Sequence, residues 1–457
     1  MNGDGQADYC VVNIQSGRVD VWYNQGPVSK SWGSQTPAGM LWWNSTTQKN
    51  APVASGVTYL EKWTAGDMVT FGDLNGDGRD EYLYVGKVDS NYTSGARQLA
   101  STALSSLSQL LGYAALTCQN RVELWDETRR IAKELVAARP SMSAAINSCL
   151  IRALSSIDET WRNHQKEEKE RGEGVKEVGV KGLVDLAQAR IDQIMRERKE
   201  VTSKLGAVFM DYITSFQEPR SQADTNSPLH ILTLSNSSTI RTALLTLSQT
   251  HPSIPLEITV MESRPRCEGA DMCAQILRFL DSKAKEKWRF KITPDCAIGT
   301  AAKDTDILLL GADRISSEGR VSNKIGSAAA AICVRHCHQQ HQQQHQHQSD
   351  SHSKGKVVIL SESDKIVAEG VEDRKTENHP AEEMSKAWSE ETRKVLEDAG
   401  VEVFGEWFEW VGWESVDVYV TERGVLDREG VKRVAEEIEG LERRVFGGGT
   451  GWYDLGE

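Results

Sequence analysis

The sequence predicts an α/β protein in which a helical zone precedes a parallel-sheet domain, with a small all-β unit at the start of the chain. From Leu229 onward, short apolar runs alternate with amphipathic helical patterns, which indicates βαβ units and a parallel sheet covered on both faces. Between residues 96 and 216 the apolar residues recur at helical spacing. Residues 1–90 instead hold short alternating runs between Gly, Asn and Asp clusters, a pattern typical of strands joined by turns.

Composition narrows the class of protein. The chain has 457 residues, of which 39% are hydrophobic, and this length favours two to four domains. We place them at 1–90, 91–222 and 225–447. The net charge of −13 argues against direct binding of nucleic acid or of an anionic membrane. Because no apolar run approaches the roughly 18 residues of a spanning helix and the N-terminus has no signal-peptide pattern, we expect a soluble cytoplasmic protein.

The all-β unit carries a calcium-loop pattern between residues 73 and 81. Oxygen-bearing side chains stand at loop positions 1, 3, 5 and 9, and calcium takes six to eight oxygens at this density. A strand pattern follows at 82–85, where an EF-hand would have a helix. The spacing resembles the FG-GAP/VCBS repeat of integrin-like β-propellers. The predicted calcium ligands are Asp73, Asn75, Asp77, the carbonyl of Arg79, and Glu81.

The same motif recurs, cut short, at Asn2, Asp4 and Asp8. Two copies cannot close a propeller, which typically needs four to eight blades. We therefore expect a partial propeller unit, either a truncated module or a gene-model fusion. A calcium-dependent adhesion-type module is the function hypothesis that this unit would support.

Strands and helices can be assigned one by one from Leu229 onward. Ligands of parallel sheets bind beyond the carboxyl ends of the strands, so the residues after each strand are the candidates for chemistry. A His/Gln-rich tract at 336–354, which holds six of the ten histidines, predicts a disordered surface insertion. The expected strands are 229–234, 257–260, 289–292, 307–310, 356–360 and 417–420, and the expected helices are 239–249, 270–285, 325–335 and 382–399.

The strongest functional signal follows the apolar strand 307–310. Gly-Ala and then Asp313 come directly after it, and Asn323 and Lys324 lie ten residues further on. We expect Asn323 and Lys324 to open a helix, whose N-terminal N–H groups and lysine charge would hold a phosphate. Asp313 would then face the sugar as an acid or base.

Other strand ends carry polar, turn-prone motifs at the same predicted edge. They include the run 262–265 with Arg264, the run 293–297, the run 421–426, and the serine-rich turn 235–238. We expect one cleft at this edge, lined by Asp313, Arg264, Asn323 and Lys324, with Ser235, Asn236, Ser237 and Ser238 on the opposite wall.

These motifs, in this order, resemble the initiation factor 2B family. That family comprises the α, β and δ regulatory subunits of eukaryotic translation initiation factor 2B, methylthioribose-1-phosphate isomerase and ribose-1,5-bisphosphate isomerase. The resemblance covers roughly residues 94–446 and includes Arg139 in an Arg-Pro-Ser turn. It implies an N-terminal α-helical bundle, a Rossmann-like domain that commonly dimerises, and no cofactor. Its ligand-binding positions fall on Arg139, Ser235, Asn236, Ser237, Arg264, Asn323 and Lys324.

The branches of the family differ in their chemistry. The isomerases use a cysteine after the first strand together with the Asp of the Gly-Ala-Asp motif. Depending on the isomerase aligned, the cysteine position falls here on Ser235 or Asn236. A serine hydroxyl has a pKa far above that of a thiol and is a poor substitute for it. The isomerases also carry an Arg where this chain has Ser94. Both departures favour a regulatory subunit.

Other residues favour the isomerase branch, namely Asp313-Arg314 and the runs 262–265 and 421–424. Our first hypothesis is a regulatory-subunit-like protein of translation initiation, a homodimer or a hetero-oligomer with other such subunits, that binds a phosphorylated pentose. The second is an aldose–ketose isomerase of a ribose 1-phosphate, with Asp313 as the catalytic acid/base.

Overall fold

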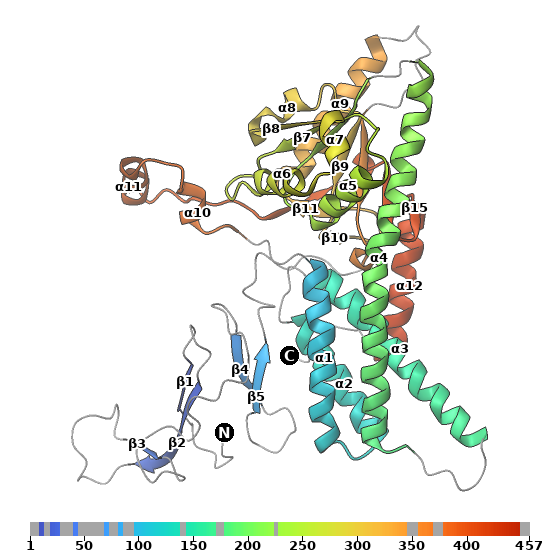
Figure 1. The fold of residues 1–457 in the computed structure, drawn as a ribbon. Coiled ribbons are helices and arrows are strands. Elements are labelled where there is room, and N and C mark those ends of the chain that lie inside the picture. The colour runs from blue at the N-terminus through green and yellow to red at the C-terminus, as the bar shows by residue number, and fades with distance from the viewer. Residues whose placement is uncertain are drawn as a thin grey trace. The chain divides into compact units, whose positions relative to one another are not determined.

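The computed structural model describes residues 9–12, 19–27, 40–43, 68–72, 81–85, 96–137, 143–170, 178–223, 227–344, 355–368 and 378–447. The described residues divide into two compact units. Figure 1 labels the helices and strands along the chain. The first draws on residues 1–94 and 106–128, and the second on residues 95–105 and 129–457. Each unit is described below by itself.

The first unit contains two antiparallel sheets. In one, β2 pairs with β1 and β3, and in the other β4 pairs with β5. The predicted calcium ligands Asp73, Asn75, Asp77 and Arg79 lie outside the described residues, and Glu81 is the first residue of β5. The calcium site and the partial propeller therefore stay predictions. The bounds are β1 (Tyr9–Val12), β2 (Val19–Pro27), β3 (Met40–Trp43), β4 (Met68–Gly72) and β5 (Glu81–Val85).

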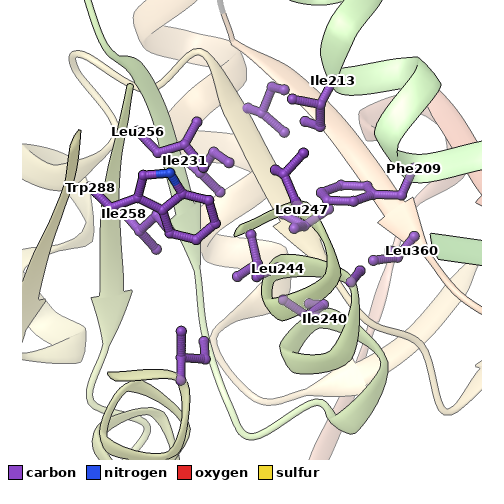
Figure 2. Close-up of a cluster of buried hydrophobic side chains, with 14 of the residues drawn as sticks. Phe209, Ile213, Ile231, Ile240, Leu244, Leu247, Leu256, Ile258, Trp288 and Leu360 are labelled. Atoms are coloured by element: carbon purple, nitrogen blue, oxygen red, sulfur yellow. The ribbon is translucent and has the colours of Figure 1, made fainter. Parts of the chain in front are cut away.

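The zone predicted to be helical consists of four helices and short connections in its described residues. It contains α1 (Ala96–Thr117), α2 (Arg121–Ala137), α3 (Ser143–Glu170) and α4 (Val180–Ala223). In α4, Leu205, Phe209 and Ile213 recur at intervals of four residues, which puts them on one face of the helix. They are buried in the same core as the sheet strands (Figure 2), so this half of α4 is a covering helix of the sheet.

A seven-stranded sheet organises the second unit, in the order β15-β14-β12-β9-β6-β7-β8. Its strands are parallel except β15, which pairs antiparallel with β14. The expected parallel sheet is thus confirmed, with one antiparallel edge strand added. The order reverses between β6 and β9, which is where such sheets bind ligands. The bounds are β6 (Leu229–Thr233), β7 (Leu256–Met261), β8 (Trp288–Thr293), β9 (Ile307–Leu310), β12 (Lys356–Leu360), β14 (Val418–Thr421) and β15 (Gly424–Leu426).

Helices cover both faces of this sheet, as the apolar strands require. Successive strand residues alternate between the two cores: Ile307 and Leu309 lie in one, Leu308 and Leu310 in the other. The first core, drawn in Figure 2, is closed by α4, α5 (Ser238–Thr250), α6 (Glu268–Phe279) and α7 (Ser282–Lys287). The second is closed by α8 (Ile298–Ala301), α9 (Ser327–Gln344) and α12 (Arg428–Phe446).

A small antiparallel sheet corrects one prediction. It contains β10 (Arg314–Ile315), β11 (Val321–Lys324) and β13 (Phe408–Val411). Asn323 and Lys324 therefore end a strand and do not open a helix. Their partners in β13 are Glu409 and Phe408, more than eighty residues away in sequence, and local periodicity cannot reveal such a pairing.

Three helix predictions also change. Helix α9 continues to Gln344, so the expectation of disorder is wrong for residues 336–344, while 345–354 lie outside the described residues. The helix predicted at 270–285 is split because Asp281 caps α7 through the N–H of Lys283. The helix predicted at 382–399 is split into α10 (Ala381–Ser385) and α11 (Glu390–Asp398), the latter capped by Ser389. None of the described helices is long and apolar enough to cross a membrane.

Candidate functional site

The loops after β6 and β9 meet at the point where the strand order reverses. A Cβ atom added at Gly311 would lie 3.1 Å from Oγ of Ser237 and 3.7 Å from Oδ1 of Asn323. These three residues, from a β6–α5 loop, a β9–β10 loop and β11, therefore lie together. A side chain at position 311 would make a tight contact with Ser237, which would have to shift by a few tenths of an ångström.

Asp313 lies at the start of the hairpin that presents Asn323. It is half-buried, and its backbone N–H donates to the carbonyl of Ser322 at 2.9 Å. This bond ties the Gly-Ala-Asp loop to β11. The structure thus brings Asp313, Asn323 and Ser237 to one end of the sheet, as the strand-end argument predicts.

Hydrogen bonds join the loops after β6, β7 and β8. The N–H of Ser235 donates to Oγ of Ser263 at 2.7 Å. The N–H groups of Ser263 and Arg264 donate to the two carboxylate oxygens of Asp295 at 2.9 and 2.7 Å. Asp295 was part of a predicted strand-end motif, but its role as the acceptor that joins β7 to β8 depends on the sheet order.

Two of these serines hold the backbone in the left-handed region, with φ of 66° at Ser235 and 61° at Ser263. This conformation costs roughly 1–2 kcal/mol for a residue that is not glycine. Strained backbone of this kind concentrates at functional sites, where the surrounding bonds maintain it. The serine-rich turn is therefore a shaped loop and not a flexible connection.

Sequence analysis missed a cation beside this turn. Arg241 lies in the first turn of α5, and its guanidinium donates to Oδ1 of Asn236 at 2.8 Å. Burial lowers its pKa. Oγ of Ser237 accepts from the N–H of Ile240 and caps the helix. The sequence does contain a signal for this cation, because Arg241 follows the helix N-cap Ser237 by four residues, just after the first strand of the sheet domain.

Lys324 is already engaged. Its ammonium lies 2.7 Å from Oε2 of Glu268 and 4.2 Å from the ring centroid of Trp407, and 5% of its side chain is exposed. Asn323 donates through Nδ2 to Oγ of Ser327 at 2.9 Å. An anionic ligand that binds Lys324 must therefore compete with Glu268.

The arginine beside Lys324 is Arg266. Its guanidinium lies 4.2 Å from the ring centroid of Trp407, the ring that Lys324 also contacts. Arg264 is instead exposed. The predicted wall of the site therefore has a different cation in it, because the left-handed turn at 263 directs the chain toward Asp295.

Around Trp407, a second layer of contacts holds Arg266 in place. His379 stacks on the ring at a centroid distance of 3.9 Å, and its Nδ1 lies 3.0 Å from Oε2 of Glu383. Glu383 also accepts three hydrogen bonds from Arg266. The hydrogen bond from Arg266 is the main cause that lowers the pKa of Glu383 to about 2. Burial lowers the pKa of His379.

The helix N-terminus proposed as a phosphate cradle is occupied by the protein itself. Oε1 of Glu409 accepts from the N–H of Gly326 at 2.6 Å and of Ala328 at 3.0 Å. A carboxylate satisfies these N–H groups and the positive end of the α9 dipole. A phosphate at this helix would therefore have to displace Glu409.

One predicted ligand-binding residue, Arg139, lies outside the described residues, so its role stays a prediction. The thiols nearest in the topology are Cys267, in the loop after β7, and Cys296, in the loop after β8. Among the residues that the structure describes, no group of three His, Cys, Asp or Glu side chains is placed to hold a metal.

This fold, a mainly parallel sheet with helices on both faces and a preceding helical zone, defines a Rossmann-like α/β protein. Within that class, the sequence shows the family to which the chain belongs. The sequence profile of the Initiation factor 2 subunit family matches residues 92–428, and the chain belongs to that family.

Two curated relatives share shorter stretches with this chain. A methylthioribose-1-phosphate isomerase of Natranaerobius thermophilus is 34% identical over 97 residues, 21% of this chain and 26% of that protein. A methylthioribose-1-phosphate isomerase of Yarrowia lipolytica is 25% identical over 222 residues, 46% of this chain and 55% of that protein. The chain therefore spans between a quarter and about half of these relatives.

Solved structures show the same fold. The tetrameric eIF2B-β2-δ2 complex from C. thermophilum matches with a TM-score of 0.51 at 13% identity, over 77% of this chain and 91% of that one. The β subunit of eIF2B from Chaetomium thermophilum matches with a TM-score of 0.50 at 14% identity, over 77% and 88%. The predicted family and fold are thus confirmed.

Proposed function

We propose that this chain is a regulatory-subunit-like protein of translation initiation that assembles with other subunits of its family and binds a phosphorylated pentose without turnover. One observation carries the proposal: the turn that follows β6 holds Ser235, Asn236, Ser237 and Ser238 and no thiol.

The missing thiol matters because of the chemistry of isomerisation. Isomerisation between an aldose and a ketose moves a proton between adjacent carbons, so the site must both take and give protons. Asp313 supplies one such group. The hydroxyl of Ser235 cannot act as the second without a base beside it, and its own N–H is committed to holding Ser263.

Contacts at the β6–β9 crevice support binding of a phosphate. Arg241 brings a cation to the first turn of α5, and the hydroxyl of Ser237 lies at the same helix end. A guanidinium and a helix N-terminus are both favourable for a phosphate. Asn323 lies across Gly311 from Ser237, where it could contact the sugar. Lys324 would join only by leaving Glu268.

Exposed apolar residues support assembly. Leu277 and Phe279, at the end of α6, are 42% and 64% exposed, and Ile292 on the edge strand β8 is 51% exposed. Helix α6 contacts β8, and apolar side chains exposed on neighbouring elements are typical of protein interaction sites. Two similar structures are titled as an eIF2B complex and an eIF2B subunit.

An isomerase of a ribose 1-phosphate is the second candidate. Asp313 and Asn323 are retained and lie at one end of the sheet. The two curated relatives carry the name methylthioribose-1-phosphate isomerase.

A combined binding and turnover assay separates the candidates. Purified protein is tested for a thermal shift with ribose 1,5-bisphosphate and with methylthioribose 1-phosphate, and for isomerisation of both. We expect a shift and no turnover, and loss of the shift in Arg241→Met. Ser235→Cys and Asn236→Cys test whether a thiol restores activity.

Wild-type turnover that Asp313→Asn abolishes would reject the regulatory proposal and favour the isomerase. In that case Cys267→Ser and Cys296→Ser would show whether a neighbouring loop supplies the missing thiol. Assembly is tested separately by co-expression with regulatory-type subunits and mass photometry. A chain that stays monomeric and binds no sugar phosphate would contradict both parts of the proposal.

A further inference from the structure

The loop that follows β12 buries charged side chains that the proposed site does not use. Glu362 directly precedes the 3-10 turn η4 (Ser363–Lys365) and is 4% exposed. Lys365 is the last residue of this turn and is 9% exposed. Buried charges persist only when they are paired and hydrogen-bonded. The partners of this turn lie in two directions.

In one direction, the η4 turn holds the Gly-Ala-Asp hairpin at both ends. The ammonium of Lys365 donates to the carbonyl of Ala312, the residue before Asp313. Two residues later, the N–H of Val367 donates to the carbonyl of Ile315 at 3.0 Å. Asp313 therefore lies between two carbonyls that are both fixed by the segment 365–367.

In the other direction, arginines of the helical zone hold the same turn. Arg97 of α1 lies 3.2 Å from Glu362, and Arg198 of α4 pairs with Asp364. Arg152 of α3 lies 3.4 Å from Asp364. All three helices therefore contact the same two carboxylates, Glu362 and Asp364.

We propose that Lys365 is a positioning residue for Asp313, and that the arginines at 97, 152 and 198 set its position, so that the helical zone controls the Gly-Ala-Asp loop. The inference rests on the proposed function only in one respect, the identity of the ligand that Asp313 would contact. The physical reason is that a charge-assisted bond to a backbone carbonyl holds a loop more firmly than a neutral one. A shift of α1, α3 or α4 would move η4 and with it the carbonyl of Ala312.

Hydrogen exchange of the full chain, measured without ligand, tests the inference. The reporter is the N–H of Asp313, which donates to Ser322, followed in peptides that cover 311–316. Lys365→Met removes the donor and keeps the chain length. We expect exchange of these peptides to rise about tenfold or more, the effect of losing a hydrogen bond from a charged group. Lys365→Arg should restore slow exchange.

A control lysine lies at the start of β12, the strand that precedes η4. Lys356 pairs with Asp417 at 3.2 Å, so Lys356→Met also removes a lysine interaction, but at the opposite end of β12 from η4. It should leave exchange of 311–316 unchanged. Asp364→Asn, which weakens the hold of Arg152 and Arg198 on η4, should raise exchange of 311–316 by a smaller factor with Lys365 intact.

Unchanged exchange of 311–316 in both Lys365→Met and Asp364→Asn would overturn the proposal. So would a rise spread evenly over the sheet, which would mean general destabilisation. If Lys365→Met does not fold, Asp364→Asn decides alone. Because no sugar phosphate enters the measurement, a failure to bind one would reject the proposed function and leave this inference standing.

Discussion

Two clusters at the carboxyl edge of the sheet fix their surroundings in different ways. The serine cluster (Ser235, Ser263 and Asp295) joins neighbouring loops through bonds to backbone N–H groups. The charged cluster (Arg97, Arg152, Arg198, Glu362 and Asp364) joins three helices to one turn through ion pairs. The serine cluster shapes a backbone locally, whereas the charged cluster fixes whole elements relative to one another.

This difference has an energetic consequence. Side chains that bond to backbone N–H groups replace water at modest net gain. Buried charges pay a large desolvation cost and become strongly destabilising when one partner is removed. Burial also raises the pKa of Glu362, although Arg97 and Lys365 oppose it, and raises the pKa of the Cys149 thiol nearby to about 12. We therefore expect the charged cluster to respond more strongly to substitution and to pH.

Arg198→Met should have the largest effect. It leaves the half-buried carboxylate of Asp364 and the buried carboxylate of Glu362 without one of their cations, at a cost of about 3–5 kcal/mol in the free energy of unfolding. Urea unfolding measures this. Arg443→Met, which removes an exposed pair with Glu439, is the matched control and should cost at most about 0.5 kcal/mol. Similar costs for the two variants would remove the distinction between the clusters.

Ser263→Ala should have the next largest effect. It leaves the N–H of Ser235 without its acceptor at a left-handed position, at a cost of about 1–3 kcal/mol. The exposed Ser238, in the same loop region, gives the control Ser238→Ala, which we expect to be nearly neutral. If Ser263→Ala lowers the free energy of unfolding more than Arg198→Met does, the serine cluster and not the charged cluster is the more sensitive of the two.

Acid should weaken the ion pairs of Glu437, which share Arg152 with the charged cluster. Arg423 and Arg152 both pair with Glu437, and the bond from Arg423 is the main cause that lowers its pKa to about 2. A carboxyl whose folded pKa is lowered stabilises the protein above its ordinary pKa of 4.5 and loses this contribution as the pH falls toward 2. Wild type should therefore exceed Glu437→Gln in Tm at pH 6, and the difference should shrink between pH 4.5 and pH 2.

The fourth prediction concerns strain in the serine cluster. Ser235 has a φ of 66°, so Ser235→Gly removes the cost of a left-handed backbone at this position. Glycine also makes the unfolded chain more flexible, so the net gain in the free energy of unfolding should be about 0.5–1 kcal/mol. The N–H that donates to Ser263 is retained. Ser238→Gly, in the first turn of α5, should instead cost about 0.5–1 kcal/mol. Destabilisation by Ser235→Gly would show that its side chain, and not its backbone, maintains the turn.

Periodicity predicted the elements well where burial is continuous along the chain. The strands 307–310 and 356–360 agree with β9 and β12 at both ends, because every residue of β9 and nearly every residue of β12 is buried. The same reasoning failed at Asn323 and Lys324. These polar residues are buried in β11 through β13 and Glu268, partners that no local pattern reveals.

By itself, the sequence determined the family, the alternation of strands and helices, and the strand-end motifs that place Asp313, Asn323 and Ser237 at one edge. It could do so because periodicity and motif spacing are local properties of a chain. Tertiary structure alone decided that Glu409 occupies the α9 N-terminus, that Arg266 replaces Arg264 beside Lys324, and that three helices hold the turn next to Asp313. These contacts join residues that are about 60 to 270 positions apart in the chain, and only the folded packing brings such residues together.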